Sequence, residues 1–137
     1  MNYWLVKSEP GCWSWQMQTD KGHTDWDGVR NYQASNNLKA MAIGDLAFFY
    51  HSVVEKRIVG IVKVTGPYVP DPTDETGRFG MVRMDTVVPL RTPVTLEQIK
   101  HDPRLCDLPL VRQSRLSVMP IPKHAWDVIC ALGQVQM

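Results

Sequence analysis

The residues with the clearest chemical potential lie in one short stretch, WDGVRNYQASNN at 26–37. Trp26 offers a flat ring for stacking, and Gly28 allows the backbone to turn with a positive φ. Arg30 can pair with phosphate or carboxylate through its planar guanidinium, and Asn31 is suited to cap a helix. This combination favours a binding site for a flat ligand with a polar edge. A tryptophan beside a turn is also a common core residue, and the stretch alone leaves both interpretations open.

Polar side chains gather at three further places, each at the end of an expected strand or helix, where functional sites tend to collect. The three clusters are Lys7-Ser8-Glu9, Tyr50-His51-Ser52 and Arg112-Gln113-Ser114-Arg115-Leu116-Ser117. If they converge on Trp26, they form a pocket with an aromatic wall, amide and hydroxyl groups, and arginines at its mouth. Such a pocket suits a base with its attached phosphate.

Each cluster also has a structural interpretation. Lys7 and Glu9 can form a solvated ion pair, and His51 can be a strand histidine whose hydrogen bonds are satisfied. Arg112 and Arg115 can tie loops together through carbonyl and carboxylate groups. The residue types alone do not choose between binding and structure.

A catalytic interpretation uses the same side chains, with His51 as the base and Asp45 or Asp85 orienting it. The candidate nucleophiles are Ser8, Ser52 and Ser117. None of these serines stands in a G-x-S-x-G turn. The histidines are scattered without the spacing of a metal site, so we expect no metal and no cofactor. An adaptor whose pocket holds a small polar metabolite is a third interpretation.

Length, charge and cysteine content narrow the class of protein. A chain of 137 residues is long enough for one domain with its own core, so we expect a single domain over 1–137. The formal net charge of +1 excludes a protein that coats nucleic acid through bulk charge. Three separated cysteines without a C-x-x-C pair fit a reducing compartment. Since no secretory signal or membrane-spanning apolar run is present, we expect a cytoplasmic protein without a membrane partner.

Hydrophobic periodicity and turn residues predict the elements that would position these groups. Expected strands cover 3–8, 46–51, 57–65, 81–90 and 115–119, and expected helices follow Ser14, Asn31, Thr95 and Pro122. The second and third strands should form a hairpin, in which Gly60 marks a bulge or a close approach. Pro89 and Pro93 should end the fourth strand. Short strands and short helices in this order favour an α+β domain with a curved sheet or small barrel.

Several ordered motifs resemble a known family. They are YWLVKSEP at 3–10, WDGVRNYQASNNL at 26–38, GDLAFFYHS at 44–52, IVGIVKV at 58–64, PVTLEQIK at 93–100 and LVRQSRLSVMPI at 110–121. Together they span nearly the whole chain and resemble the EVE domain family. The resemblance implies a PUA-like β-barrel, a curved mixed sheet with short peripheral helices, similar in fold to PUA and YTH domains. It also implies a non-catalytic module that recognises a modified base, particularly modified cytosine in DNA, with modified RNA as the other polymer.

The resemblance also assigns roles to matching positions. Trp26 resembles the cage tryptophan of the YTH relatives. The other positions that match motifs lining the family's pocket are Ser8, Asn31, Tyr50, His51, Ser52, Arg112, Ser114, Arg115 and Ser117. With Lys7 and Arg30 from the polar clusters, they form the expected ligand-binding set. The helix near Pro122 departs from the family, in which serine or threonine usually caps it. The chain also lacks the long basic N-terminal tail of nuclear eukaryotic members, so we expect a stand-alone bacterial form.

Overall fold

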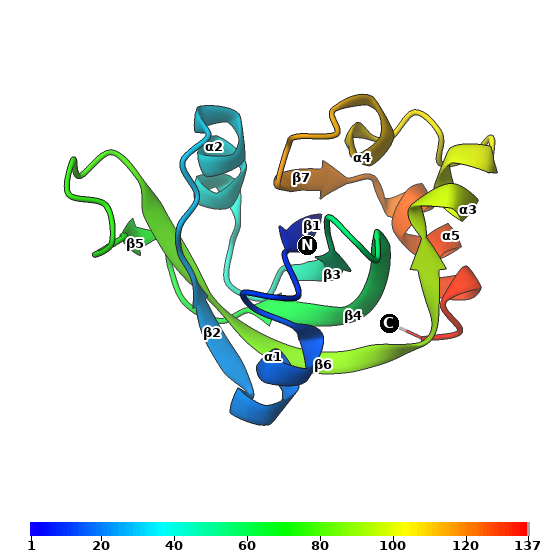
Figure 1. The fold of residues 1–137 in the computed structure, drawn as a ribbon, viewed down its shortest axis with the longest axis horizontal. Coiled ribbons are helices and arrows are strands. Elements are labelled where there is room, and N and C mark those ends of the chain that lie inside the picture. The colour runs from blue at the N-terminus through cyan, green and yellow to red at the C-terminus, as the bar shows by residue number, and fades with distance from the viewer. Residues whose placement is uncertain (137) are drawn as a thin grey trace.

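Seven strands form one mixed sheet in the computed structural model, which describes residues 1–136 (Figure 1). The strands are β1 (Tyr3–Ser8), β2 (His23–Trp26), β3 (Leu46–His51), β4 (Arg57–Val64), β5 (Val69–Pro70), β6 (Gly80–Thr95) and β7 (Val118–Ile121). The helices are α1 (Trp15–Lys21), α2 (Tyr32–Ala40), α3 (Leu96–His101), α4 (Pro109–Arg112) and α5 (Lys123–Leu132). Over these residues, none of the helices has both the length and the apolar character needed to cross a membrane.

The sheet has the order β2-β6-β4-β3-β1-β7, with the short β5 paired to β6. β1 and β3 run parallel, whereas the other paired strands are antiparallel. Figure 1 shows the long β6 sweeping beneath β3 and β4, with α2 towards one of its ends and α3 and α5 towards the other. Helix α2 packs against both β6 and β7, and its Asn37 Nδ2 donates to the Val118 carbonyl oxygen at 2.8 Å. The expected α+β domain with a curved sheet and short peripheral helices is confirmed.

All the residues of strand β3 are buried, which shows that this strand lies at the centre of the core. Successive side chains of a strand point to opposite faces of the sheet, so Phe48 and Phe49 meet different neighbours. Phe48 stacks on Trp126 of α5 with 3.9 Å between ring centroids. Phe49 lies edge to face with Trp15 and Trp26, at centroid distances of 5.2 and 5.5 Å. β3 therefore separates the layer packed against α5 from the layer of Trp15, Phe49 and the candidate residue Trp26, which we term the aromatic layer.

The longest strand is the main departure from the sequence prediction. β6 continues through Pro89 and Pro93 instead of ending there. β2 pairs only with the first part of β6, and Pro89 lies opposite Gly60, where the pairing of β4 with β6 changes register. Proline has no backbone N–H to donate to a neighbouring strand. That donor is not needed where the pairing of β6 with β4 is irregular and the other edge of β6 has no partner strand. The structure also contains β2, β5 and α4, which are not predicted from the sequence, and β7 starts later than expected.

Gly60 combines the two features expected of it. The pairing of β4 changes register beside it, and the indole of Trp15 covers it closely. A Cβ atom built at Gly60 would overlap Cη2 of Trp15. The missing side chain therefore lets the start of α1 sit against the β3–β4 hairpin, next to the aromatic layer.

Gly60→Ala is expected to lower the free energy of unfolding by about 1–3 kcal/mol, the usual cost of overpacking a well-packed site. Gly11→Ala is the control, because a Cβ at Gly11 meets nothing within 4 Å and should change stability by less than ~0.5 kcal/mol. Urea unfolding of both variants measures the difference. Equal midpoints for the two variants would contradict the close approach of Trp15.

Candidate functional site

A cleft of about 560 Å³, which we term the main cleft, opens beside the C-terminal end of β1. Its lining residues are Lys7, Ser8, Glu9, Cys12, Trp13, Lys21, Thr24, Asp25, Trp26 and Asp27. They come from the end of β1, the loop before α1, the end of α1, and β2 with the residue that follows it. The cleft therefore brings together Lys7, Ser8 and Trp26 of the expected set and adds several residues that the sequence analysis does not include.

Two tryptophans line the main cleft, and they differ in burial. Trp26 is 7% exposed and meets Phe49 edge to face, so it belongs to the core as well as to the wall. Trp13 is partly exposed, and its Nε1 donates to Gln18 Oε1 at 2.8 Å. Lys21 Nζ lies 5.9 Å from the centre of the Trp13 ring. Trp13 is therefore held in place while part of its surface stays accessible for stacking.

Lys7 is a half-buried charge in the main cleft. Its Nζ donates to the Ser114 carbonyl oxygen at 2.9 Å and lies 5.7 Å from the centre of the Tyr50 ring. Burial lowers the pKa of Lys7 from its ordinary value, and burial raises the pKa of Tyr50 to about 12. Tyr50 is therefore neutral near pH 7 and supports the ammonium group from beneath the cleft lining.

The remaining charges make the main cleft slightly acidic. Glu9, Asp25 and Asp27 are exposed carboxylates, and Lys21 is an exposed ammonium group. With Lys7, the lining holds three acidic and two basic side chains. Carboxylates accept hydrogen bonds and ammonium groups donate them. A ligand with donors and acceptors on one edge is therefore suited to this lining.

A second hollow of about 310 Å³ contains much of the C-terminal polar cluster. Its lining residues are Asn31, Gln33, Arg112, Gln113, Ser114, Arg115 and Leu116. Arg112 Nη2 lies 2.6 Å from Asp107 Oδ1, so the guanidinium is already engaged. Arg115 is exposed and makes no ion pair within residues 1–136. The hydrogen bond from Lys7 to Ser114 links this second hollow to the main cleft.

The catalytic arrangement considered from the sequence is not formed. His51 Nε2 accepts from the Trp15 backbone N–H at 2.9 Å. Its Nδ1 lies 3.2 Å from Glu55 Oε1, in a contact too poorly aligned to be a hydrogen bond. Both ring nitrogens therefore face protein groups. Asp45 lies beyond the opposite end of β3, and Asp85 lies on β6, two strands away in the sheet.

Other expected residues make structural contacts. The Ser8 hydroxyl donates to the Trp13 carbonyl oxygen. Asn31 Oδ1 accepts from the Ala34 N–H at 2.9 Å and caps α2, as its sequence position predicts. The expected residues that line neither hollow are Arg30, Tyr50, His51, Ser52 and Ser117. The predicted set is therefore divided among the main cleft, the second hollow and residues that line neither, and it does not converge as a whole on Trp26.

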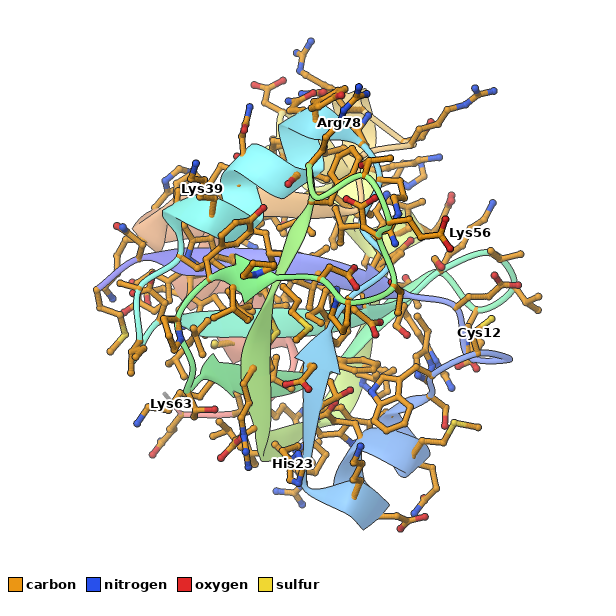
Figure 2. All side chains as sticks on the ribbon, turned by 90° about the vertical axis from the view of Figure 1, so that its left-hand side faces the viewer. Cys12, His23, Lys39, Lys56, Lys63 and Arg78 are labelled. Carbon is orange, nitrogen blue, oxygen red and sulfur yellow. The ribbon has the colours of Figure 1, made fainter. Side chains whose placement is uncertain are left out.

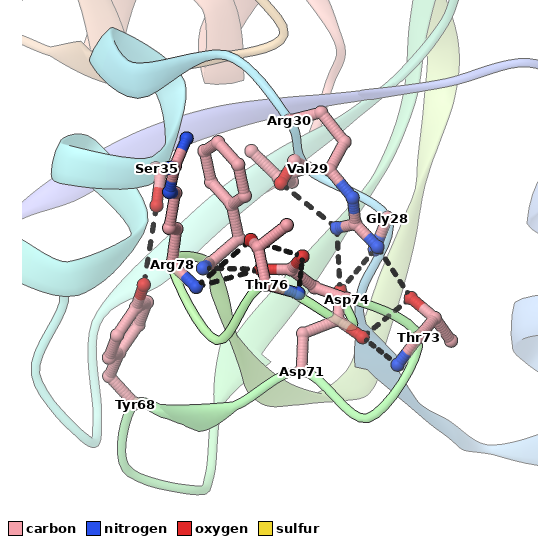
Figure 3. Close-up of polar contacts among 11 residues, drawn as sticks. Gly28, Val29, Arg30, Ser35, Tyr68, Asp71, Thr73, Asp74, Thr76 and Arg78 are labelled. Carbon is pink, nitrogen blue, oxygen red and sulfur yellow. Dashed lines mark hydrogen bonds and ion pairs between the residues drawn. The ribbon is translucent and has the colours of Figure 1, made fainter.

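Arg30 stabilises the turn after β2. Its Nη1 lies 3.0 Å from Asp71 Oδ2, which also accepts from the Gly28 N–H at 2.8 Å (Figure 3). Asp71 accepts as well from the N–H and the hydroxyl of Thr73. Burial by itself would raise the pKa of Asp71, but these hydrogen bonds, that of the Thr73 hydroxyl foremost, outweigh burial and hold the pKa well below its usual range. Since Gly28 directly follows the cleft lining and has a φ of +75°, Asp71 fixes the turn that ends the Trp26 wall.

Two of the three carboxylates of the main cleft, Asp25 and Asp27, are not predicted as site residues from the sequence, because β2 is short. Its four residues, HTDW, lie between a helix stop at Gly22 and the turn at Gly28. Pairing with β6 makes this segment a strand, and that pairing is not visible locally. The available signal was the position of Asp25 and Asp27 directly before and after Trp26 in the sequence.

A curved mixed sheet with short peripheral helices defines a PUA-like α+β domain. The YTH domain of Zygosaccharomyces rouxii MRB1, solved with N6-methyladenosine RNA, has the same fold at a TM-score of 0.59. It is 16% identical, and the match covers 98% of this chain and 88% of that domain. The EVE domain family model matches residues 2–132. The chain belongs to the EVE domain family, as its ordered motifs indicate.

Relatives of this family align along nearly the whole chain. Thymocyte nuclear protein 1 of Rattus norvegicus is 31% identical over 98% of this chain and 75% of its own length. The crystal structure of a protein from Agrobacterium tumefaciens is 44% identical, with a TM-score of 0.94 over 98% of this chain and 94% of that one. Human THYN1, solved in complex with DNA containing 5-methylcytosine, is 29% identical with a TM-score of 0.90, and the match covers 100% of both chains.

Asp71→Asn is expected to lower the free energy of unfolding at pH 7 by about 1.5–3 kcal/mol, the range for hydrogen bonds to a charged group. Because the folded-state pKa of Asp71 is depressed, its contribution is present above the unfolded value of about 3.9 and is lost as the pH falls through the folded pKa. Wild-type stability should therefore decline below about pH 4 more steeply than that of the variant.

Urea unfolding at a series of pH values measures the two slopes. Glu75→Gln is the matched control, because Glu75 is an exposed carboxylate in the same loop. Its profile should follow that of the wild type. Parallel profiles for wild type and Asp71→Asn would show that Asp71 does not hold the turn through its charge.

Proposed function

We propose that this protein is a non-catalytic reader of a modified base in nucleic acid, and that the base enters the main cleft. The observation that carries the proposal is the lining of that cleft, where Trp13 and Trp26 accompany a half-buried ammonium group and three carboxylates. Human THYN1, which aligns with the whole chain, was solved with DNA that contains 5-methylcytosine. That relative supports modified cytosine as the base and DNA as the polymer. Binding of this kind needs no cofactor.

The lining can replace the interactions that a base loses when it leaves the stack. An aromatic face restores stacking, and Trp13 is the accessible one. The edge of cytosine carries an amino donor as well as acceptors. Asp25 and Asp27 can accept from the amino group, while the Lys7 ammonium can donate to an acceptor. The apolar face of Trp26 suits a methyl group on the ring.

The second hollow supplies the contact with the backbone of the nucleic acid. Arg115 is exposed, and no carboxylate within residues 1–136 pairs with it. Arg112 contributes less, because Asp107 already holds its guanidinium. Since Lys7 links the two hollows through Ser114, a base in the main cleft and a neighbouring phosphate beside Arg115 can belong to one strand. The protein then makes few phosphate contacts, in keeping with its small net charge.

Trp13→Ala should weaken binding of an oligonucleotide with one 5-methylcytosine by roughly ten- to a hundredfold, the loss expected when a stacking ring is removed. Trp13→Phe should retain part of the affinity, because a smaller ring still stacks. Fluorescence anisotropy with the modified oligonucleotide and its unmodified counterpart measures the change. The same titration with RNA that contains 5-methylcytosine decides the preferred polymer.

Thermal melting of the same variants separates binding from folding. Met17→Ala is the control, because Met17 is a large side chain of α1, 43% exposed and outside the cleft lining. Trp26→Ala is a poorer test, since removal of this core ring should cost about 3–5 kcal/mol of stability. A folded Trp13→Ala protein with undiminished preference for the modified oligonucleotide would refute stacking in the main cleft.

The salt dependence of binding should be shallow. With about two neutralised phosphates, the log–log slope on duplex DNA should be roughly −2. Arg115→Ala should reduce that slope by about one, whereas Arg91→Ala, which changes an exposed arginine of β6, should leave it unchanged. Titrations at several salt concentrations measure the slopes. A slope several times steeper would indicate a broad basic face instead of the second hollow.

A further inference from the structure

The turn between β3 and β4 carries two exposed apolar side chains, Val53 and Val54, which we term the valine tip. They are 59% and 85% exposed. The Val54 N–H donates to the Ser52 carbonyl oxygen at 2.9 Å, and Val53 between them has a φ of +70°. Such a three-residue turn is rare and strained, and a β-branched residue at positive φ is an outlier. Neither burial nor local preference explains this conformation.

The valine tip is fixed beside the main cleft. The Ser52 N–H donates to the Ser8 carbonyl oxygen at 2.9 Å, and Ser8 lines the cleft. Figure 2 shows the loops that carry Cys12 and Lys56 projecting from the same side of the molecule. Cys12 belongs to the cleft lining, and Lys56 lies in the turn that carries the tip. A nucleic acid that places a base in the cleft therefore also meets the tip.

The charges around the valine tip suit a polyanion. Glu55 follows the tip, but its Oε1 lies 2.9 Å from Arg57 Nη2 and 3.2 Å from His51 Nδ1. Lys56 is exposed and makes no ion pair within the described part of the chain, residues 1–136. The acid beside the tip is therefore engaged, whereas the neighbouring ammonium group is available to a phosphate.

We propose that the valine tip enters the gap that opens in a DNA duplex when the modified base moves into the main cleft. This inference rests on the proposed function, because it concerns the same extruded base. Extrusion leaves the neighbouring bases unstacked, and apolar side chains inserted between base steps stabilise a duplex distorted in this way. The strained turn keeps the two valines projecting from the end of β3, as strained residues at functional sites often do. A single strand has no such gap, so the tip acts only on duplex DNA.

The test compares the wild type with a double variant, Val53→Gly with Val54→Ala. Glycine accepts the positive φ, so the variant removes the apolar tip without adding strain to the turn. The probes are a duplex with one 5-methylcytosine, its unmodified counterpart, and the modified strand alone. The variant should bind the modified duplex about tenfold more weakly, the order expected when a few buried methyl groups are lost. Its affinity for the modified single strand should equal that of the wild type.

A fluorescent base analogue beside the modified cytosine gives a second readout, because its emission changes when the neighbouring stack opens. Ile43→Ala is the matched control, since Ile43 is 63% exposed and precedes the opposite end of β3. Unchanged duplex affinity in the double variant would overturn the valine tip proposal alone, and so would equal weakening on duplex and single strand. A wild-type protein that prefers no probe with 5-methylcytosine, whether DNA or RNA, over its unmodified counterpart would overturn the proposed function itself.

Discussion

Strand β3 is buried on both faces, and the layers around it are arranged to seal those faces. On one face the stacked rings of Phe48 and Trp126 close the core against α5. On the other, Phe49 is covered by Trp15 and Trp26, and Trp26 also lines the main cleft. The aromatic wall of the site is therefore an extension of the core. Its position is set by packing, and the ligand does not have to order it.

The turn that follows Trp26 is also fixed in position, in this case by hydrogen bonds to a carboxylate outside the strands of the sheet. The buried carboxylate of Asp71 joins two segments that lie far apart in the sequence, because it accepts hydrogen bonds from Gly28 and Arg30 after β2 and from Thr73 in its own loop. A buried charge is stable only when its partners are in place. The turn after Trp26 thus has one acceptable geometry. Rigidity of this kind reduces the entropy lost when a ligand binds.

Local signals made much of this structure predictable. Ser14, Asn31 and Thr95 cap helices with side-chain hydrogen bonds to residues a few positions away, so the sequence alone contains both partners. The hairpin of β3 and β4 is equally local. The rest depends on distant partners: β6 passes through Pro89 because of its irregular pairing with β4. For the same reason the polar clusters near β1 and the C-terminal arginines could be identified, but their division between two hollows could not.

The parallel pairing of β1 with β3 has a consequence for how this scaffold can change. Neighbouring parallel strands end at the same edge, so the loops that follow them emerge side by side. Each loop can be lengthened or replaced without shifting the register of the other strand. In the proposed function, the loop after β1 borders the cleft that receives the base, and in the valine tip proposal the loop after β3 faces the surrounding polymer. Natural variation or laboratory design can therefore retune selectivity for the base and for its structural context independently, by exchanging one loop at a time.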